Sequence, residues 1–150
     1  MGTRLKDFAT KVVAVAEPET TALVVAQLMR RHHIGALVIV EPGEKTRPVG
    51  IVTDRDLVLE LMAEGLDPAL FTAGDIMSVD LVLAHPEMDV LEAVALMGAH
   101  HLRRLAIVDD KGRLVGIVTL EDVLEVLTGQ LANLATGIAA ARDREVVERR

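Results

Sequence analysis

The sequence predicts an α+β fold built from two copies of one unit, in which a strand, a helix, two further strands and a second helix follow one another. Three observations predict it. The 150-residue chain repeats itself, its apolar runs are short and rich in Val, Leu and Ile, and these runs alternate with segments of helical periodicity. One copy alone cannot bury both faces of its small sheet, so the two copies should pack together about a pseudo-two-fold axis.

The repetition is visible by direct alignment. Residues 12–41 align with residues 80–109 at a constant offset, and the matched positions include a proline, a glutamate, a Leu-Met pair and a His-His pair. After a turn that is longer in the first copy, residues 49–61 align with residues 115–127, where both copies read VGIVT. Agreement in the same order over such stretches indicates a duplicated structural unit.

Each copy is expected to contain the same elements in the same order. A Pro-Glu pair at Pro18 or Pro86 should start the first helix, in which apolar residues recur at steps of three and four. A polar turn then joins the second and third strands as a hairpin, and the third strand runs directly into the second helix. The strands expected in the first and second copies are 12–15 and 81–84, 37–40 and 105–108, and 49–52 and 115–118.

Along the chain, this pattern places the first repeat at 3–66 and the second at 67–128. The second repeat begins with a connecting linker at 67–78, which contains a proline, a glycine and a short Asp-Ile-Met segment. Residues 129–150 are expected to form a C-terminal helical extension and tail.

The extension has an apolar stripe of its own. Leucines and an isoleucine step by three and four from Leu124 to Ile138, which is the a/d pattern of a coiled-coil seam. We expect a second copy, in a homodimer, or a partner protein to cover the part of this stripe that lies beyond the repeat. The charged residues of the tail, 142–150, are expected to be solvated or frayed.

The composition argues against several classes of function. Aromatic residues make up 1% of the chain and the net charge is −7, which disfavours nucleic acid as a partner because stacking rings and a basic surface are lacking. Cysteine is absent, so neither a disulfide framework nor a thiolate metal site is expected. The start of the chain does not resemble a signal peptide and the apolar runs are short, so we expect a cytoplasmic protein without a membrane partner.

The chain also offers little material for catalysis or metal binding. Ser78 is the single serine, no nucleophile motif surrounds it, and Tyr is absent, so we expect a protein that is not an enzyme. The pairs His32-His33 and His100-His101 cannot each chelate one ion, because adjacent helical side chains point about 100° apart. No metal site is therefore predicted.

The junction between the third strand and the second helix carries the same motif in both copies. Thr53 and Asp56 correspond to Thr119 and Asp122, and this Thr-x-x-Asp spacing is that of a capping box, in which the two side chains cap their own helix. The same atoms suit a sugar-phosphate, because a helix N-terminus favours phosphate and a nearby carboxylate can accept ribose hydroxyls. A glycine in each preceding strand permits close approach of another backbone or a ligand. The motif alone leaves both interpretations open.

The duplicated unit ending in Gly-Ile-Val-Thr-x-x-Asp resembles the cystathionine-beta-synthase (CBS) domain pair, over about residues 3–128. The resemblance implies a disc-like pair of repeats with two clefts that accept AMP, ADP, ATP or S-adenosylmethionine. It also implies a non-catalytic regulatory role toward an attached or partner protein. The alternative is a constitutive oligomerisation or scaffold module whose clefts are vestigial.

The resemblance also assigns roles to residues. Asp56 and Asp122 match the acid that binds ribose, Thr53 and Thr119 match the hydroxyl that meets phosphate, and first-strand residues would contact adenine. The full set of residues expected at the ligand is Thr53, Asp54, Arg55, Asp56, Thr119, Asp122, Arg103, Arg104, Val12, Val13, Leu81, Val82, Ile34, Gly35 and Ala36.

The two copies differ at positions where the resemblance implies phosphate contacts. Gly35 and Ala36 stand in the first copy where Arg103 and Arg104 stand in the second, and Arg55 is replaced by Glu121. One Arg–phosphate contact contributes roughly 1.5–3 kcal/mol, which corresponds to about tenfold or more in affinity. We therefore expect the two clefts to differ in affinity.

Overall fold

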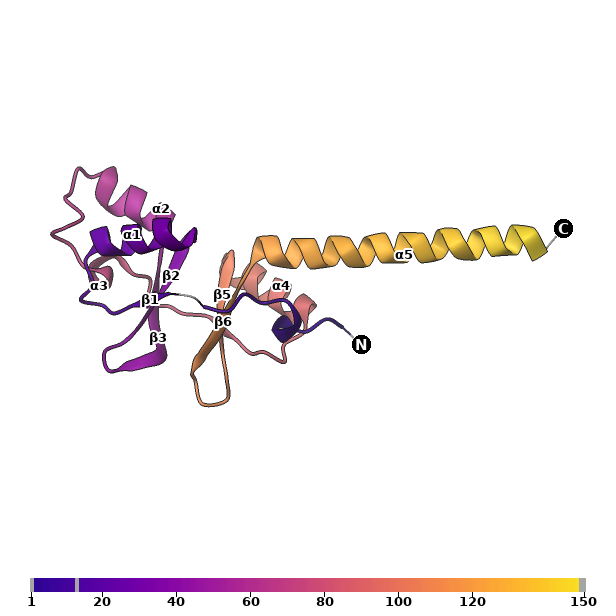
Figure 1. The fold of residues 1–150 in the computed structure, drawn as a ribbon, viewed down its shortest axis with the longest axis horizontal. Coiled ribbons are helices and arrows are strands. Elements are labelled where there is room, and N and C mark those ends of the chain that lie inside the picture. Colours follow the sequence, from indigo (N-terminus) through magenta and orange to yellow (C-terminus); the bar gives the residue numbers. More distant parts are fainter. Residues whose placement is uncertain (1, 13, 149–150) are drawn as a thin grey trace.

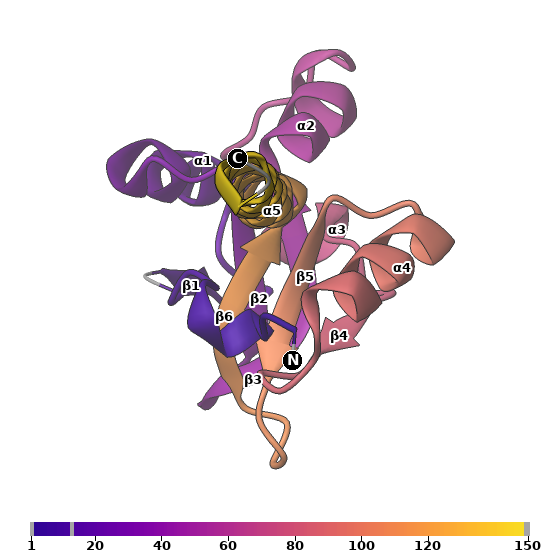
Figure 2. The same cartoon turned by 90° about the vertical axis from the view of Figure 1, so that its right-hand side faces the viewer.

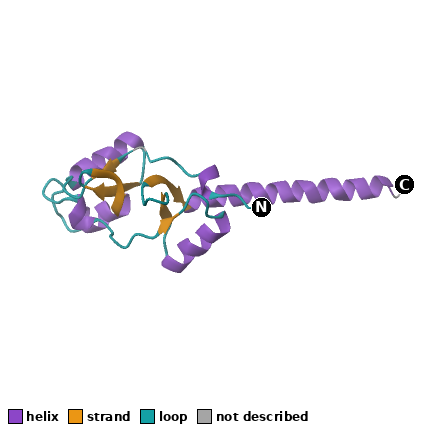
Figure 3. Cartoon of the chain, turned by 90° about the horizontal axis from the view of Figure 1, so that it is seen from below, coloured by secondary structure: helices purple, strands orange, loops and turns teal. Residues whose placement is uncertain are grey.

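The computed structural model describes residues 2–12 and 14–148 and shows the predicted α+β fold of two repeats with a long C-terminal helix. The repeats lie side by side and the C-terminal helix extends away from them (Figure 1). The strands of both repeats lie at the centre of the body, with helices outside them (Figure 3).

The two sheets have the same topology. Their strand orders are β1-β2-β3 and β4-β5-β6, and in each the first strand is parallel and the third antiparallel to the middle strand. The register repeats as well, because Gly50 faces Ile39 in one sheet and Gly116 faces Ile107 in the other. The strands are β1 (Val15–Ala16), β2 (Ala36–Glu41), β3 (Glu44–Thr53), β4 (Leu83–Ala84), β5 (Arg104–Val108) and β6 (Leu114–Thr119).

The first helix of each repeat begins later than predicted. Thr21 caps α1 by accepting a hydrogen bond from the Val24 N–H, and Asp89 caps α4 by accepting one from the Leu91 N–H. These caps satisfy amides at the start of each helix, whereas Pro18 and Pro86 lie in the turns before them. The helices are α1 (Ala22–His32), α2 (Asp54–Asp56), α3 (Ala73–Ile76), α4 (Val90–His100) and α5 (Leu120–Glu148), with a 3-10 turn η1 (Leu5–Asp7) and a π-helical segment η2 (Leu57–Met62).

Each repeat has its own aliphatic core. In the first, Val25 of α1 packs with Leu37, Ile39 and Val52 of the sheet. In the second, Ala93 of α4 and the strand residues Leu105, Ile107 and Val118 take the corresponding places. The middle strands are buried along most of their length, which is why they read as continuous runs of Val, Leu and Ile.

The first strands are shorter than predicted, because the residues before them pack on the opposite repeat. Thr10 exchanges backbone hydrogen bonds with Ile117 of β6, in which Thr10 N–H donates to the Ile117 carbonyl at 3.1 Å and the Ile117 N–H donates back at 2.9 Å. Ser78 makes the equivalent pair with Ile51 of β3, at 2.9 and 3.1 Å. β1 therefore shares only Val15 with the strand predicted at 12–15, and β4 is the second half of the strand predicted at 81–84.

The helical turns that precede Thr10 and Ser78 also pack on the opposite repeat. η1 packs on the second repeat, where the Leu5 N–H donates to the Met88 carbonyl, and α3 packs on the first, where the Ala73 N–H donates to the Thr20 carbonyl. Leu5 is fully buried in the core of the second repeat. Each packed unit thus contains a lead-in segment from elsewhere in the chain, namely 3–10 on the second repeat and 71–78 on the first.

α5 is one continuous helix from Leu120 to Glu148, about 43 Å long. The tail was expected to be solvated or frayed from Arg142 onward; the helix continues to Glu148, and its residues 142–144 are exposed to solvent. By length and composition α5 is also able to cross a membrane, and 6% of its most apolar window is buried. Figure 2, which looks along α5, shows it above the end of β6.

Candidate functional site

A cavity of about 250 Å³ lies between the two repeats. It joins the end of α1 and the start of β2 in the first repeat to β6 and the start of α5 in the second. Its lining residues are Thr10, His33, Ile34, Gly35, Ala36, Arg104, Ile117, Thr119 and Asp122. Residues from both copies and from the exchanged lead-in segment therefore build one site.

A smaller apolar pocket of about 50 Å³ adjoins this cavity and shares Thr10, Ile34, Ala36 and Ile117 with it. Its further lining residues are Lys11, Val12, Ala14 and Val38. We call the two spaces together the inter-repeat crevice. One end of the crevice is aliphatic, and the other carries a hydroxyl, a carboxylate, a guanidinium and an imidazole.

The polar end is set by the start of α5. The Thr119 side chain accepts a hydrogen bond from the Asp122 N–H at 3.1 Å, and Asp122 Oδ2 accepts one from the Thr119 N–H at 3.3 Å. The capping-box interpretation is therefore confirmed here. A carboxylate has about four acceptor positions, so the cap does not exhaust Asp122, which also lines the crevice.

The same capping box occurs at two other helix starts. Thr53 and Asp56 make it before α2 with distances of 3.1 and 2.8 Å, and Thr72 and Asp75 make it before α3 with 3.3 and 2.8 Å. Thr53, Asp56, Thr72 and Asp75 lie outside the lining of the crevice. Capping alone is thus common to three sites, whereas exposure of the cap to the inter-repeat crevice is specific to Thr119 and Asp122 among them.

Arg104 extends from the second repeat to the backbone of the first. A Cβ atom built on Gly35 would lie 3.2 Å from Arg104 Nη2 and 3.1 Å from Asp54 Oδ2, so the guanidinium and the carboxylate both approach this glycine. Arg104 is half-buried and lines the polar end of the crevice. Gly35 therefore provides room for a cation from one repeat and an acid from the other.

Arg103, its neighbour, is engaged elsewhere. Its Nη2 donates to Glu121 Oε1 at 2.7 Å, on the surface. The pKa of Glu121 lies below its ordinary value of 4.5, mainly because its carboxylate accepts its own backbone N–H and then because Arg103 donates to it. The two predicted arginines are thus separated: Arg104 faces the crevice, and Arg103 neutralises the acid that would repel a phosphate.

The structure brings together part of the predicted ligand set. Val12, Ile34, Gly35, Ala36, Arg104, Thr119 and Asp122 line the crevice, and Asp54 lies beside it at Gly35. Leu81 and Val82 are half-buried and lie outside the crevice, with Val82 packed on the core of the second repeat. Arg55 is exposed on α2, and Val13 lies outside the described residues.

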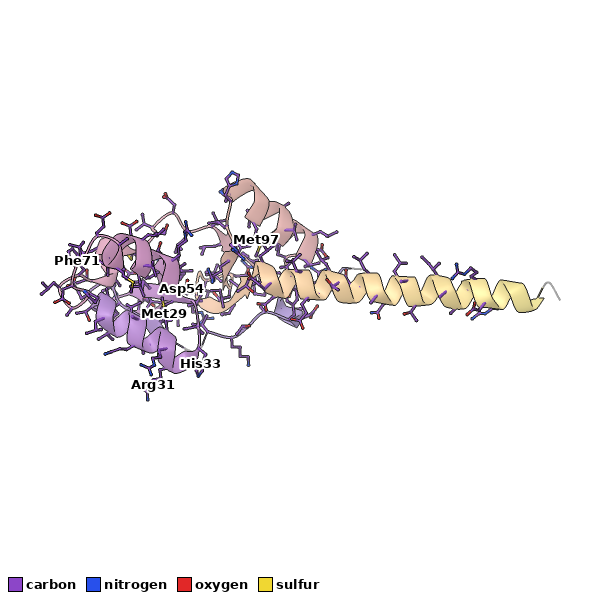
Figure 4. All side chains as sticks on the ribbon, turned by 90° about the horizontal axis from the view of Figure 1, so that it is seen from above. Met29, Arg31, His33, Asp54, Phe71 and Met97 are labelled. Carbon is purple, nitrogen blue, oxygen red and sulfur yellow. The ribbon has the colours of Figure 1, made fainter. Side chains whose placement is uncertain are left out.

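The predicted ligand set lacks six further residues that line the crevice: Thr10, Lys11, Ala14, His33, Val38 and Ile117. His33 ends α1 in the left-handed conformation, with φ of 54°, and lines the cavity. Figure 4 shows His33 and Asp54 on the side of the first repeat nearest the second, while Arg31 points outward. Thr10 reaches the crevice because the lead-in segment 3–10 packs on the second repeat, and the sequence pattern does not reveal this packing.

A larger, open groove of about 480 Å³ lies on the far side of the start of α5. It is lined by Thr3, Phe8, Asp122, Glu125, Val126, Gly129, Gln130 and Asn133. Two carboxylates face it and none of its lining residues is cationic, so it is poorly suited to a phosphate. The inter-repeat crevice is the better anion site.

The comparisons with known proteins agree with this geometry. The family model of the CBS domain matches residues 5–63 and 73–129. The chain belongs to the CBS domain family. The two matched segments are the two repeats, so the protein contains a CBS pair, and most of α5 lies beyond the match.

Two relatives show how far the similarity extends. The CBS domain-containing protein YhcV of Bacillus subtilis is 38% identical over 135 residues, which cover 90% of this chain and 91% of YhcV. The uncharacterized protein MK0525 of Methanopyrus kandleri is 45% identical over 120 residues, which cover 80% of this chain but 60% of that longer protein.

Among solved structures, the CBS domain pair of protein MJ0100, in complex with 5′-methylthioadenosine and S-adenosyl-L-methionine, superimposes with a TM-score of 0.76. It is 28% identical, and the similarity covers 87% of this chain and 99% of that one. The ligands in that structure belong to the MJ0100 pair, and both of them carry an adenosyl group.

Proposed function

We propose that this CBS pair is a non-catalytic regulatory module that binds an adenine nucleotide or an adenosyl ligand in the inter-repeat crevice. The observation that carries the proposal is the meeting of Thr119 and Asp122 with Ile34–Ala36 and Arg104 around one cavity between the repeats. The adenosyl ligands of the related MJ0100 pair support the same class of ligand.

Each end of the crevice suits one part of such a ligand. Val12, Ala14 and Val38 form an aliphatic slot for a flat base, in a chain that has almost no aromatic residues for stacking. Asp122 can accept the ribose hydroxyls with the acceptor positions that its cap leaves free. A phosphate would then face the N-terminus of α5 and the Arg104 guanidinium, both of which favour negative charge.

A ligand in this position would contact both repeats at once. It would therefore favour the arrangement of the repeats in which its two sets of contacts are made together, and a partner protein that recognises this arrangement would respond to the ligand as a population shift. The regulated partner in this proposal is another chain or a second copy of this one.

Calorimetric titration with AMP, ADP, ATP and S-adenosylmethionine tests the proposal. We expect one of these ligands to bind the wild-type protein, and Asp122→Ala to reduce its affinity at least tenfold. Asp75→Ala is the matched control, because it removes the same type of cap outside the crevice. It should lower the melting temperature but leave the affinity unchanged. Equal losses of affinity in both variants would show that capping alone is being measured.

A second candidate is a constitutive scaffold with vestigial clefts. It is favoured by the three Thr-Asp capping boxes, which are complete without any ligand. The absence of binding for all four ligands at millimolar concentration would support it. Because the chain has neither Trp nor Tyr, a co-purified nucleotide would also dominate the absorbance near 260 nm, which gives a rapid first distinction.

A further inference from the structure

Four of the five apolar residues that form the stripe of α5 from Leu124 to Ile138 are exposed to solvent. Leu124, Leu131, Leu134 and Ile138 have exposed fractions of 54, 66, 61 and 59%. Leu127 lies on the same stripe but is half-buried against the core of the second repeat. The stripe continues beyond residue 129, where the family match ends, so it does not belong to the packing of the CBS pair itself.

The projecting part of α5 is poorly suited to exist as a lone helix. It contains Gly129 and Gly137, each of which costs about 1 kcal/mol relative to Ala in a helix interior. Isolated helices of this length are marginal in water even with better sequences. No charged residue occurs between Glu125 and Arg142, so few ion pairs along the helix are available to support it. Tertiary or quaternary packing must stabilise this segment.

The heptad positions of the stripe define how two copies could pack. Leu124, Leu131 and Ile138 occupy a positions, and Leu127, Leu134 and Ala141 occupy d positions. In an antiparallel pair each a residue packs against a d residue of the other helix. One register then gives the layers Leu131–Leu134, Leu127–Ile138 and Leu124–Ala141, each formed twice by symmetry, and every layer is apolar.

The flanking charges distinguish this register from a parallel one. The antiparallel register places Glu121 of each copy, at an e position, beside Arg142 of the other, also at an e position. In the parallel register the flanking g–e pairs are Val123–Thr128, Gln130–Ala135 and Gly137–Arg142, none of which joins opposite charges. Flanking charges commonly set helix orientation in coiled coils. The Glu121 side chain is 60% exposed even though it pairs with Arg103, so a second cation can approach it.

We propose that two copies of this protein associate through α5 as a symmetric antiparallel coiled coil centred between Leu131 and Leu134. Such an interface uses the same patch on both copies and closes on itself, so the assembly is a dimer and not a filament. This inference does not depend on ligand binding in the crevice, because Asp122, which lines the crevice, occupies an f position on the side of α5 opposite the seam.

A lipid bilayer is the competing occupant, since α5 has the length and mean hydropathy of a membrane-spanning helix. The charge-free stretch 126–141 is about 24 Å long, shorter than a hydrocarbon core of about 30 Å. It also contains Thr128, Gln130, Asn133 and Thr136 on the faces outside the seam. A narrow stripe with polar flanks fits a helix partner better than surrounding lipid.

Sedimentation equilibrium of the full chain tests the association. We expect a dimer, and Leu131→Asp should raise its dissociation constant at least tenfold. Ala132→Asp is the matched control, because it adds the same charge at the adjacent exposed position outside the seam, and it should leave the dimer intact. Arg142→Glu should weaken the dimer, and adding Glu121→Arg should restore it. A wild-type monomer at high micromolar concentration would overturn the proposal.

Cysteine pairs test the orientation, since the natural chain has no cysteine. In the antiparallel register, a mixture of Leu124→Cys chains and Ala141→Cys chains forms mixed disulfide dimers on mild oxidation, while Leu124→Cys alone does not, because its two copies lie about 26 Å apart. Efficient cross-linking of Leu124→Cys alone would show a parallel pair and overturn the proposal. So would flotation of the wild-type protein with phosphatidylcholine–phosphatidylglycerol vesicles as a monomer.

Discussion

Arg104 of the second repeat lies against Gly35 of the first, so closely that a Cβ atom on Gly35 would come within 3.2 Å of Arg104 Nη2. The two residues occupy almost equivalent places, one at the start of β5 and the other just before β2. The first copy thus has a small residue where the second has an arginine, and the space left by one accommodates the side chain of the other. This asymmetry places the Arg104 guanidinium at the inter-repeat crevice.

Gly35→Ala should disturb this contact without unfolding the protein. The added methyl group must push the Arg104 guanidinium or the Asp54 carboxylate aside by a few tenths of an ångström, so we expect a several-fold loss of affinity for phosphate-containing ligands. Gly98→Ala in α4 is the control, since nothing lies within 4 Å of its added atom. It should leave binding unchanged and raise stability by up to about 1 kcal/mol. Calorimetry measures the affinities and thermal unfolding the stability.

Arg104→Gln should reduce the affinity for AMP about tenfold or more while leaving adenosine binding nearly unchanged, because the lost interaction is with the phosphate. Arg103→Gln should have little effect on either ligand, since Arg103 is paired with Glu121 on the surface. Titrations of both variants with both ligands decide the matter. Equal effects of the two substitutions would contradict the separation of the arginines.

Leu5→Ala should destabilise the second repeat, although Leu5 lies near the start of the chain. Its side chain is fully buried in the core of that repeat, and truncating a buried Leu costs about 2–5 kcal/mol. Hydrogen exchange should show the earliest loss of protection in α4 and β6. Faster exchange confined to α1 and β2 would contradict the observed exchange of lead-in segments.

Lowering the pH should weaken the packing of the N-terminal segment on the second repeat, because Glu87 becomes protonated and loses its ion pair with Lys6. The pKa of Glu87 lies below its ordinary value of 4.5, chiefly because Lys6 Nζ donates to it at 2.8 Å. Since the folded pKa is the lower one, this ion pair stabilises the fold above about pH 4.5, and its contribution is lost as the pH falls through the folded value. The effect is small because Glu87 is exposed.

Glu87→Gln provides the comparison. Between pH 6 and pH 3, the melting temperature of the wild-type protein should fall slightly more than that of Glu87→Gln. Parallel curves for the two proteins would show that the pair contributes nothing.

The sequence predicted the parts of the fold that depend on local pattern. The buried runs in β2 and β5 and the duplicated order of elements follow from hydrophobic spacing, and both were confirmed. The Pro-Glu pairs predict helix starts that are too early, because the helices begin only after the caps Thr21 and Asp89. The crossing of lead-in segments was missed, since a pairing such as Thr10–Ile117 leaves no periodic signal.

One signal of that crossing was present. Gly50 and Gly116 are each expected to permit close approach of another group. An added Cβ at Gly50 would meet the Met77 side chain first and then the Ser78 carbonyl at 3.1 Å, and one at Gly116 would meet the Thr10 carbonyl at 3.1 Å. The site was predicted in part for a similar reason. Thr119 and Asp122 were found from their motif, whereas His33 and Lys11 reach the crevice through tertiary geometry that one sequence does not encode visibly.

The crossed lead-in segments make the halves of this protein inseparable. If the chain were divided at residue 66, the first fragment would keep residues 3–10, which pack on the second repeat, and lack residues 71–78, which pack on its own sheet. The second fragment would have the opposite defect. Each fragment would therefore have a sheet edge that only the other fragment could cover. The two halves should therefore be transferred or deleted together, and a chain split between them should fold only when both fragments are present at once.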